Sequence, residues 1–261
     1  MLDLIIKNGW VVNATHSQQM DIAVKDGKIV AMGQASLFPE AEKTVDAAGL
    51  WVLPGMIDTH VHMNKRFGAS PSQDNYYNGS IAAAYGGTTA IVDFGFPYGD
   101  ETPAQAMERK LEEIKGQSVI DYSFHYNLTK ANEENYGQIR ELIQQGFPSV
   151  KMFTIFNYGR MLEKAGIYEV LRIIAKENGL SMVHTESADL IDRYISDTVA
   201  KGHTLPIDLA KTRPPITELE ALYALIAMVE DTGAPTIVAH LTASGAAPAI
   251  AKAKQTMPLF I

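Results

Sequence analysis

Two histidines separated by one residue, His60 and His62, follow an apolar run over residues 51–57. On a β-strand, side chains two residues apart point to the same face, so both imidazoles can reach one metal ion. Imidazole is a common ligand for zinc and other first-row divalent metals. The spacing therefore predicts a metal site at the end of a buried strand. The alternative is a chance His-x-His pair on a solvated strand.

Three later segments place polar groups within or at the end of apolar runs. His184 and His240 each end such a run, and Lys151 lies inside the apolar segment 149–153. In a (β/α)8 barrel the active site lies at the C-terminal ends of the strands. If these runs are barrel strands, four histidines and one lysine converge on one site. The alternative for Lys151 is a strand-edge lysine that reaches solvent.

The composition indicates which class of protein this is and which residue types could bind a metal. The chain has 261 residues, 46% hydrophobic and 20% charged, with a formal net charge of −8. Such a chain folds as an ordinary globular protein, and its acidic balance argues against a nucleic-acid partner. We find no apolar run long enough to span a membrane and no secretion signal, and we therefore expect a cytoplasmic protein. Because the chain has no cysteine, any metal must be bound by His, Asp, Glu or a modified Lys.

The elements that must position these residues fall into two parts. Residues 1–52 are typical of a small all-β unit, with Asn8-Gly9 and Asp26-Gly27 as hairpin signals. Residues 53–261 alternate strand and helix, which predicts an α/β fold with a parallel sheet. We expect the first six strands of this part to end near residues 62, 94, 126, 154, 184 and 240, with a seventh opening at 258. A barrel of eight strands would be incomplete, so we expect either a fragment or strands supplied from elsewhere.

Several segments, in order along the whole chain, resemble the dihydropyrimidinase/hydantoinase branch of the amidohydrolase superfamily. They cover residues 54–62, 86–94, 121–125, 149–153, 184–187, 212–220 and 240–244. The resemblance implies a (β/α)8 TIM-type barrel over residues 53–261, flanked by a β-sandwich of which residues 1–52 form a portion. It spans only about the first half to three-fifths of a typical family member.

The resemblance implies a role for each candidate ligand. His60 and His62 correspond to ligands of the more buried of two divalent metal ions, with zinc as the default. Lys151 corresponds to a lysine carboxylated by CO2 that bridges both ions. His184 and His240 correspond to ligands of the second ion. The family's sixth ligand, an aspartate on strand eight that also acts as general base, matches no residue up to Ile261.

Other positions are expected to shape the site. The family usually has a tyrosine five residues after the lysine, which hydrogen-bonds the tetrahedral intermediate. Phe156 stands there in this chain, and Tyr158 is the substitute that we expect if the loop is rearranged. Asn64 begins a polar loop that we expect to line the substrate pocket. Asp58 and Asp93, each at a strand end, either hold a ligand histidine through its second ring nitrogen or cap the next turn.

The activity that the resemblance implies is metal-dependent hydrolysis of a cyclic amide. A hydroxide shared by the two metals would open a dihydropyrimidine, hydantoin or related ureide to an N-carbamoyl acid. A small cyclic ureide and other copies of the chain, in a homotetramer, are the partners expected. The alternatives are an allantoinase-like or dihydroorotase-like hydrolase, or a non-catalytic scaffold homologue.

Overall fold

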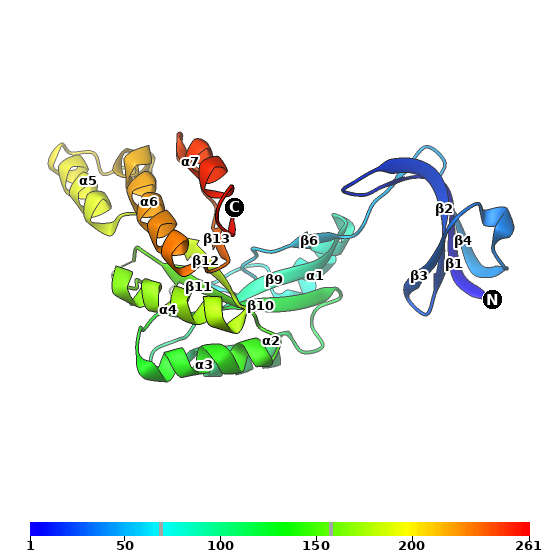
Figure 1. The fold of residues 1–261 in the computed structure, drawn as a ribbon, viewed down its shortest axis with the longest axis horizontal. Coiled ribbons are helices and arrows are strands. Elements are labelled where there is room, and N and C mark those ends of the chain that lie inside the picture. Colours follow the sequence, from blue (N-terminus) through cyan, green and yellow to red (C-terminus); the bar gives the residue numbers. More distant parts are fainter. Residues whose placement is uncertain (68–69, 157–158) are drawn as a thin grey trace. The chain divides into compact units, whose positions relative to one another are not determined.

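A computed structural model describes residues 1–67, 70–156 and 159–261 of the chain (Figure 1). The chain divides into two compact units, Met1–Met56 and Ile57–Ile261. In the described part, no helix is both long and apolar enough to cross a membrane.

The N-terminal unit is a five-stranded sheet built around one central strand. Strand β1 (Leu2–Val12) pairs with β2 (Ser17–Lys25) antiparallel and with β4 (Ala41–Asp46) and β5 (Trp51–Val52) in parallel. Strand β3 (Lys28–Gly33) completes the order β3-β2-β1-β4, and a 3-10 turn, η1 (Ala35–Leu37), follows it. The buried side chains of Leu2, Ile5 and Ala23 form its core.

One of the two predicted hairpin turns in this unit is confirmed, and the other is wrong. Asp26-Gly27 joins β2 to β3, with Lys25 opposite Lys28. Asn8-Gly9 instead lies within β1, where the pairing register shifts between Ile6 and Gly9 as in a β-bulge. A Cβ at Gly9 would lie 2.5 Å from Cγ2 of Val52, so glycine there permits close strand packing rather than a turn.

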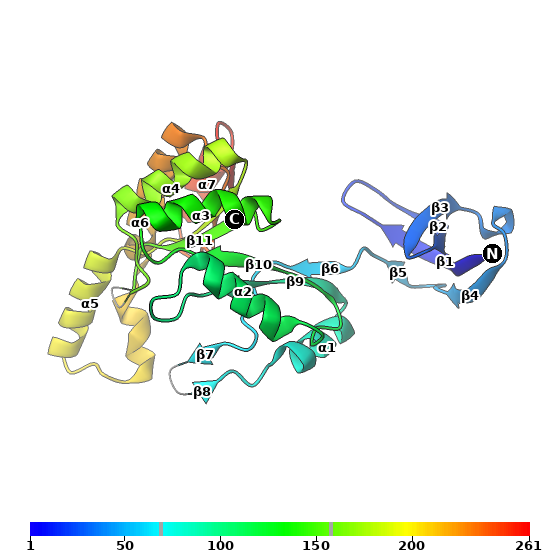
Figure 2. The same ribbon diagram turned by 90° about the horizontal axis from the view of Figure 1, so that it is seen from below.

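The larger unit is a curled half-barrel, which confirms the predicted α/β fold class (Figures 1 and 2). Its sheet follows the order of the chain, from β6 to β14, and all pairings recorded from β9 onward are parallel. The strands are β6 (Met56–Asp58), β9 (Thr88–Gly95), β10 (Asp121–Asn127), β11 (Ser149–Phe153), β12 (Leu180–His184), β13 (Thr236–Val238) and β14 (Leu259–Phe260). A short antiparallel pair, β7 (Arg66–Phe67) and β8 (Ser70–Pro71), forms within the polar loop that begins at Asn64.

Helices connect these strands and cover the outer face of the sheet (Figure 2). They are α1 (Tyr76–Tyr85), α2 (Pro103–Ile114), α3 (Glu133–Gln144), α4 (Lys164–Glu177), α5 (Ala188–Ala200), α6 (Pro215–Thr232) and α7 (Ala246–Ala253), with a 3-10 segment η2 (Pro206–Thr212). Their boundaries follow local signals. Helix α2, for example, begins with a capping box of Thr102 and Gln105 and with Pro103 in its first turn.

The alternation of side chains along the strands decides which residues face the interior of the half-barrel. On β11 all residues are buried, and Val150 and Met152 belong to the large core between sheet and helices. Phe153 belongs instead to a smaller aromatic cluster with Phe94 on β9. Because successive side chains point to opposite faces of a strand, Lys151 lies on the same face as Phe153. The sheet thus directs the lysine into the interior.

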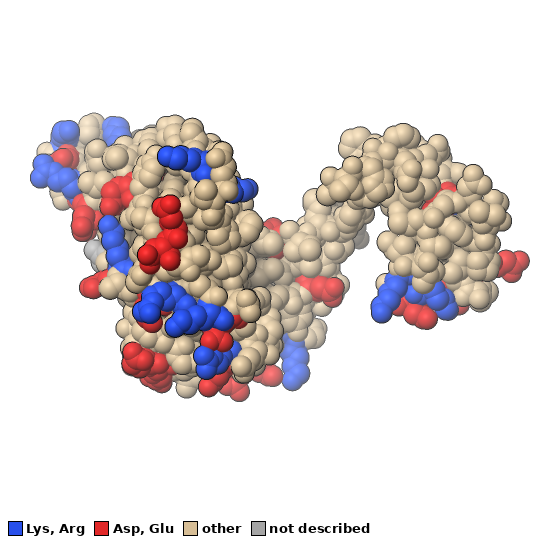
Figure 3. Space-filling model, in the orientation of Figure 1, with Lys and Arg blue, Asp and Glu red and all other residues tan. Residues whose placement is uncertain are grey.

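The surface of the larger unit carries charges of both signs. Figure 3 shows acidic and basic side chains interspersed on one face of it. Exposed ion pairs between and within helices contribute to this surface, such as Arg140 with Glu177 at 2.6 Å and Arg172 with Glu169 at 2.8 Å.

Candidate metal centre

One cavity of about 340 Å³ brings together all five of the predicted metal-binding side chains. His184 is the last residue of β12, His240 follows β13 by two residues, and Lys151 is the central residue of β11. His60 and His62 follow β6. The side chains therefore come from four strands or strand ends and meet inside the half-barrel, as the active-site residues of a (β/α)8 barrel do.

The four imidazoles form a chain of neighbouring rings from His62 through His60 and His240 to His184. The ring centroids of His60 and His62 are 5.4 Å apart, those of His60 and His240 are 5.4 Å apart, and those of His184 and His240 are 4.6 Å apart. Within the described residues, no three His, Asp or Glu side chains by themselves form a metal-binding group. The four imidazoles line one cavity with Lys151, so a metal bound by two of them would need a further ligand to complete its coordination shell.

Lys151 has the features of a lysine that can be modified. It is 2% exposed, and its Nζ has no hydrogen-bond partner among the described residues. The rings of Phe153 and Phe94 lie 5.1 and 5.8 Å from that nitrogen. Burial, with a smaller effect from the charge of Lys65, lowers the pKa of Lys151 to about 7. A buried amine that has no hydrogen-bond partner among the described residues, and whose neutral form is populated near pH 7, can react with CO2, and the carbamate so formed would have two oxygens for metal ions.

The electrostatics of the cavity keep three imidazoles in the form that binds metal. Burial, together with the neighbouring positive charges, lowers the pKa of His60 to about 4, of His62 to about 3 and of His240 to about 4. These rings are therefore neutral at pH 7, as ligand imidazoles must be. The residues present fit a pair of divalent ions in their chemistry.

His184 is held by a carboxylate, that of Glu186, which was not predicted as a site residue. Its Nε2 lies 2.6 Å from Oε2 of Glu186, and Nε of Arg213 lies 3.2 Å from the other oxygen. Burial alone would raise the pKa of Glu186, but the hydrogen bond from His184 and the charge of Arg213 outweigh it, and the pKa lies below its ordinary value. An acidic residue two positions after a strand-end histidine is the signal that marks such a pair.

The two aspartates at strand ends make other contacts. Asp58 accepts a hydrogen bond from the backbone N–H of His60 at 3.1 Å, which is the turn-capping role. Asp93 accepts one from the backbone N–H of Phe94 and another from the Tyr76 hydroxyl, each at 2.7 Å. No ring nitrogen of the four histidines is among the hydrogen-bond partners recorded for either carboxylate in the described residues.

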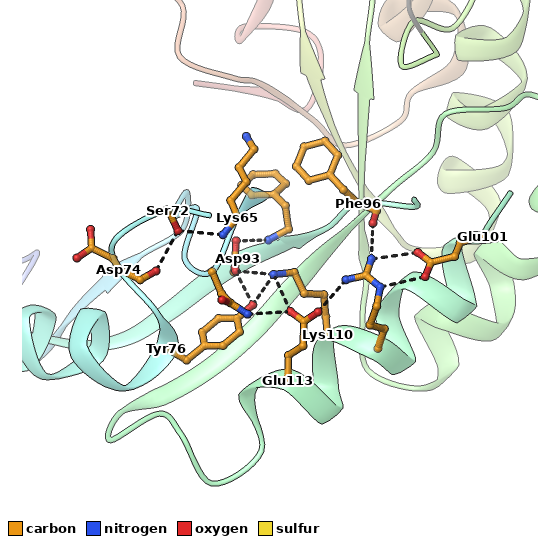
Figure 4. Close-up of polar contacts among 12 residues, drawn as sticks. Lys65, Ser72, Asp74, Tyr76, Asp93, Phe96, Glu101, Lys110 and Glu113 are labelled. Carbon is orange, nitrogen blue, oxygen red and sulfur yellow. Dashed lines mark hydrogen bonds and ion pairs between the residues drawn. The ribbon is translucent and has the colours of Figure 1, made fainter. Parts of the chain in front are cut away.

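Asp93 instead belongs to a buried polar cluster beside the cavity (Figure 4). Nζ of Lys110 lies 3.5 Å from Asp93 and 3.5 Å from Glu113, and it donates to the Tyr76 hydroxyl at 2.7 Å. Asp93 and Lys110 are only 1% and 3% exposed. Burial raises the pKa of Asp93 by more than Lys110 and Tyr76 lower it, so the net shift is upward. A lysine on the apolar face of α2, between Met107 and Ile114, is the sequence signal for this cluster.

Of the predicted substrate-pocket residues, Phe156 lines the cavity and Asn64 does not. Phe156 lines the cavity, with its ring centroid 5.3 Å from that of His184, whereas Nδ2 of Asn64 donates to Glu113 at 3.3 Å. Tyr158 lies outside the described residues. Phe156 and His240 both have positive φ angles, of 78° and 39°. Such angles are unusual for a bulky residue and tolerated somewhat better by histidine.

Two cations also line the cavity, Lys65 and Arg160, and neither was predicted as a site residue. A second cavity of about 630 Å³ shares the imidazoles of His184 and His240 with the first and is lined by Glu186. The two histidines thus stand where the cavities meet.

Comparison with known proteins finds a matching family and similar relatives over nearly the whole chain. Residues 51–257 match the family described as "Amidohydrolase family". The D-hydantoinase of Geobacillus stearothermophilus is 35% identical over 252 residues, 96% of this chain and 53% of that protein. The dihydropyrimidinase of Rattus norvegicus is 33% identical over 257 residues, 97% of this chain and 50% of that protein. The chain thus spans about half the length of the curated relatives that it matches.

Solved structures show the same fold. The crystal structure of dihydropyrimidinase from Brevibacillus agri superposes with a TM-score of 0.93 at 33% identity, covering 99% of this chain and 56% of the other. The structure of D-hydantoinase from a Bacillus species gives a TM-score of 0.93 at 32% identity, covering 98% and 56%. The resemblance found in the sequence motifs is confirmed.

Proposed function

Because the chain belongs to the amidohydrolase family, we propose that it carries the metal-binding half of a hydrolase that opens cyclic ureides. The substrate would be a dihydropyrimidine, a hydantoin or a related ring, and the product an N-carbamoyl acid. One observation carries the proposal: four imidazoles line a single cavity with a buried lysine whose Nζ has no hydrogen-bond partner among the residues described. Relatives named D-hydantoinase and dihydropyrimidinase, which match nearly the whole chain, support the substrate class.

We assign His60 and His62 to one divalent ion, His184 and His240 to the other, and carboxylated Lys151 to both. Zinc suits these ligands. The chemistry that two such ions supply when bound is activation of water and polarisation of the ring carbonyl.

The chain's own residues prepare the site for this chemistry. Burial populates the neutral form of the Lys151 amine near pH 7, so its nitrogen can form a bond to the carbon of CO2 and release a proton. Glu186 fixes the orientation of the His184 ring through its Nε2. The rings of Phe94, Phe153 and Phe156 form apolar walls of the cavity, which exclude water and offer faces to a flat ring.

Metal content and intact mass of the purified protein test the proposal first. We expect about two ions per chain, an added mass equal to one CO2 that is lost on acid treatment, and release of an N-carbamoyl acid from dihydrouracil or hydantoin. Lys151→Met should remove the added mass and most of the metal and activity. His203→Ala, in an exposed turn, is the control and should leave the added mass, the metal content and the activity unchanged. A protein with less than one ion and no ring opening would contradict the proposal.

The assembly and compartment expected from the resemblance, a homotetramer in the cytoplasm, stay predictions. Light scattering on the purified protein tests the first, and cell fractionation tests the second.

A further inference from the structure

The side-chain amide of Asn127, the last residue of β10, is buried without a hydrogen-bond partner. Asn127 is 0% exposed, and neither its amide nitrogen nor its amide oxygen has a partner among the described residues. Burial of an unpaired amide costs free energy, because the hydrogen bonds that it makes to water in the unfolded chain are not replaced. Such a group in a folded protein therefore indicates a further group that the amide binds.

Asn127 lies beside Lys151 and on the same face of the sheet. Strands β10 and β11 are hydrogen-bonded neighbours, with Tyr126 opposite Val150 and Asn127 opposite Lys151 (Figure 1). Tyr126 and Val150 belong to the core between the sheet and the helices. Because successive side chains alternate between the two faces of a strand, Asn127 and Lys151 both point into the half-barrel. Neighbouring strands are about 4.8 Å apart, so the two side chains begin about that far from each other.

Both members of this neighbouring pair lack a hydrogen bond. Nζ of Lys151 has no partner among the described residues, and so it does not donate to the amide oxygen of Asn127 either. The contacts recorded for Nζ are instead with the aromatic rings of Phe94 and Phe153. Two unpaired polar groups, side by side in the interior, indicate that one further group bonded to both would complete this part of the site.

The carbamate proposed for Lys151 has the hydrogen-bonding groups that the amide needs. When the neutral amine forms its bond to the carbon of CO2, it releases one proton to water and keeps one N–H. That N–H can donate to Oδ1 of Asn127, and Nδ2 of Asn127 can donate to a carbamate oxygen. Hydrogen bonds to a charged group are stronger than those between neutral groups, so the amide favours the carbamate over the free amine.

We propose that Asn127 is a positioning residue that binds the carbamate of Lys151 and stabilises it. The hydrogen bonds also restrict rotation of the carbamate, so its oxygens keep one orientation toward the metal ions. This inference rests on the proposed function, since that function supplies the carbamate, and it assigns a role to a side chain outside the predicted ligand set.

The test measures the affinity of Lys151 for CO2. Carbon-13 NMR of the purified protein, titrated with labelled bicarbonate at fixed pH, gives the fraction of carbamate. We expect Asn127→Leu, which has nearly the same shape, to bind CO2 about tenfold more weakly, the effect of losing a hydrogen bond to a charged group. The ratio should be similar with and without added Zn²⁺, because the amide acts on the lysine. Asn127→Gln keeps the amide and should recover part of the loss.

Tyr126→Phe is the matched control. The Tyr126 hydroxyl is also buried and unpartnered among the described residues, but it belongs to the core on the other face of β10. Tyr126→Phe and Asn127→Leu each remove an unpaired polar group, so neither should lower the melting temperature in CO2-free buffer. Added bicarbonate should raise the melting temperature of the wild type and of Tyr126→Phe more than that of Asn127→Leu, since a ligand of the folded state stabilises it.

Four results would overturn the inference. The first is an equal CO2 affinity in the wild type and Asn127→Leu, since the amide would then be satisfied by water. The second is an equal loss of affinity in Tyr126→Phe. The third is a difference that appears only with Zn²⁺, because Asn127 would then act on the ion. The fourth is a lower melting temperature of Asn127→Leu in CO2-free buffer with no loss of CO2 affinity, which would make its role purely structural.

The same titration separates this inference from the proposed function. If the wild type and Asn127→Leu form the carbamate equally well, the role of Asn127 fails and the hydrolase proposal stands. If the wild type shows no carbamate at saturating bicarbonate, with or without Zn²⁺, both fail. If the carbamate forms with the expected tenfold ratio but dihydrouracil is not opened, the role of Asn127 stands and the hydrolase proposal fails.

Discussion

The imidazole of His184 and the carboxylate of Glu186 form one hydrogen-bonded unit, with Nε2 and Oε2 2.6 Å apart. Arg213 fixes the far side of the carboxylate. The backbone supports the same arrangement, because the Thr154 hydroxyl donates to the carbonyl of His184 and accepts from the N–H of Glu186. With Nε2 engaged in this way, the second ring nitrogen is the one left to bind a metal.

Replacing Glu186 with glutamine should weaken metal binding at the His184 side of the cavity. The amide NH2 can donate to Nε2 and stabilise the tautomer in which the other ring nitrogen carries the proton. We expect the affinity for one of two ions to fall about 10- to 100-fold, as for other partners of ligand histidines. Competition with a chelator measures this. Glu177→Gln, in a surface ion pair, is the control, and an equal affinity in both variants would refute the role of Glu186.

Carboxylation of Lys151 should depend on pH with a midpoint near 7. Burial lowers the pKa of this amine from its ordinary value of 10.5 to about 7. Above pH 7 the amine is therefore mostly neutral and can react with CO2, and below it the amine is protonated and cannot. Carbon-13 NMR with labelled bicarbonate should show a carbamate signal that rises through pH 7 and is absent in Lys151→Met. A midpoint near 10 would mean that the lysine is solvated.

Removing the buried cation Lys110 should destabilise the larger unit strongly. Lys110→Met leaves the Asp93 carboxylate buried without its cation, and the Tyr76 hydroxyl without its donor. We expect a loss of about 3–5 kcal/mol in the free energy of unfolding, measured with urea. Lys115→Met, in an exposed pair with Glu112, should lose less than about 1 kcal/mol.

The double variant Asp93→Asn/Lys110→Met sharpens that test. It removes the uncompensated charge along with the cation, so it should be more stable than Lys110→Met alone. A double variant that is less stable by the sum of both single losses would show that the two residues do not interact.

His125 should matter to metal binding without touching the metal. It is buried, and its ring nitrogens lie 2.5 Å from Oγ of Ser149 and 2.9 Å from the carbonyl oxygen of Thr59. It thus ties β10 to the residue before His60. We expect His125→Phe to lower the free energy of unfolding by about 2–4 kcal/mol, since the buried Ser149 hydroxyl and the Thr59 carbonyl both lose their hydrogen bond to the ring.

The same variant should also retain less metal at the His60 end, as measured by metal analysis. Ser149→Ala removes only one of the two contacts and serves as the comparison, with an expected loss of about 1 kcal/mol. If folded His125→Phe kept its full metal content, His125 would not be needed to position His60.

The sequence could predict those parts of the structure that depend on local pattern. The apolar run 149–153 forms a fully buried strand as expected, and Asp26-Gly27 forms a hairpin turn because both residues accept a positive φ. The regular alternation of strand and helix was enough to predict the parallel sheet and hence a common edge for the histidines.

Other parts depend on contacts between distant residues, which no local pattern contains. The turn signal at Asn8-Gly9 is overridden because the side chain of Asn8 bonds Asp46 and its backbone N–H bonds Asp21, both far along the chain. The partners of Asp93 come from two helices, through Tyr76 and Lys110. The amide of Asn64 is likewise drawn to Glu113 rather than to the cavity.

Phe156 and His240 both have positive φ angles, which strain the backbone, and both side chains line the cavity. Glycine at either position would relieve backbone strain of the order of 1 kcal/mol. At Phe156 it would also remove the packing of the ring against Phe153. The same exchange would delete an aromatic wall at one position and an imidazole at the other. A screen for thermal stability alone would therefore combine the relief of strain with the loss of the side chain, whereas a screen that also measures metal content would separate the two effects.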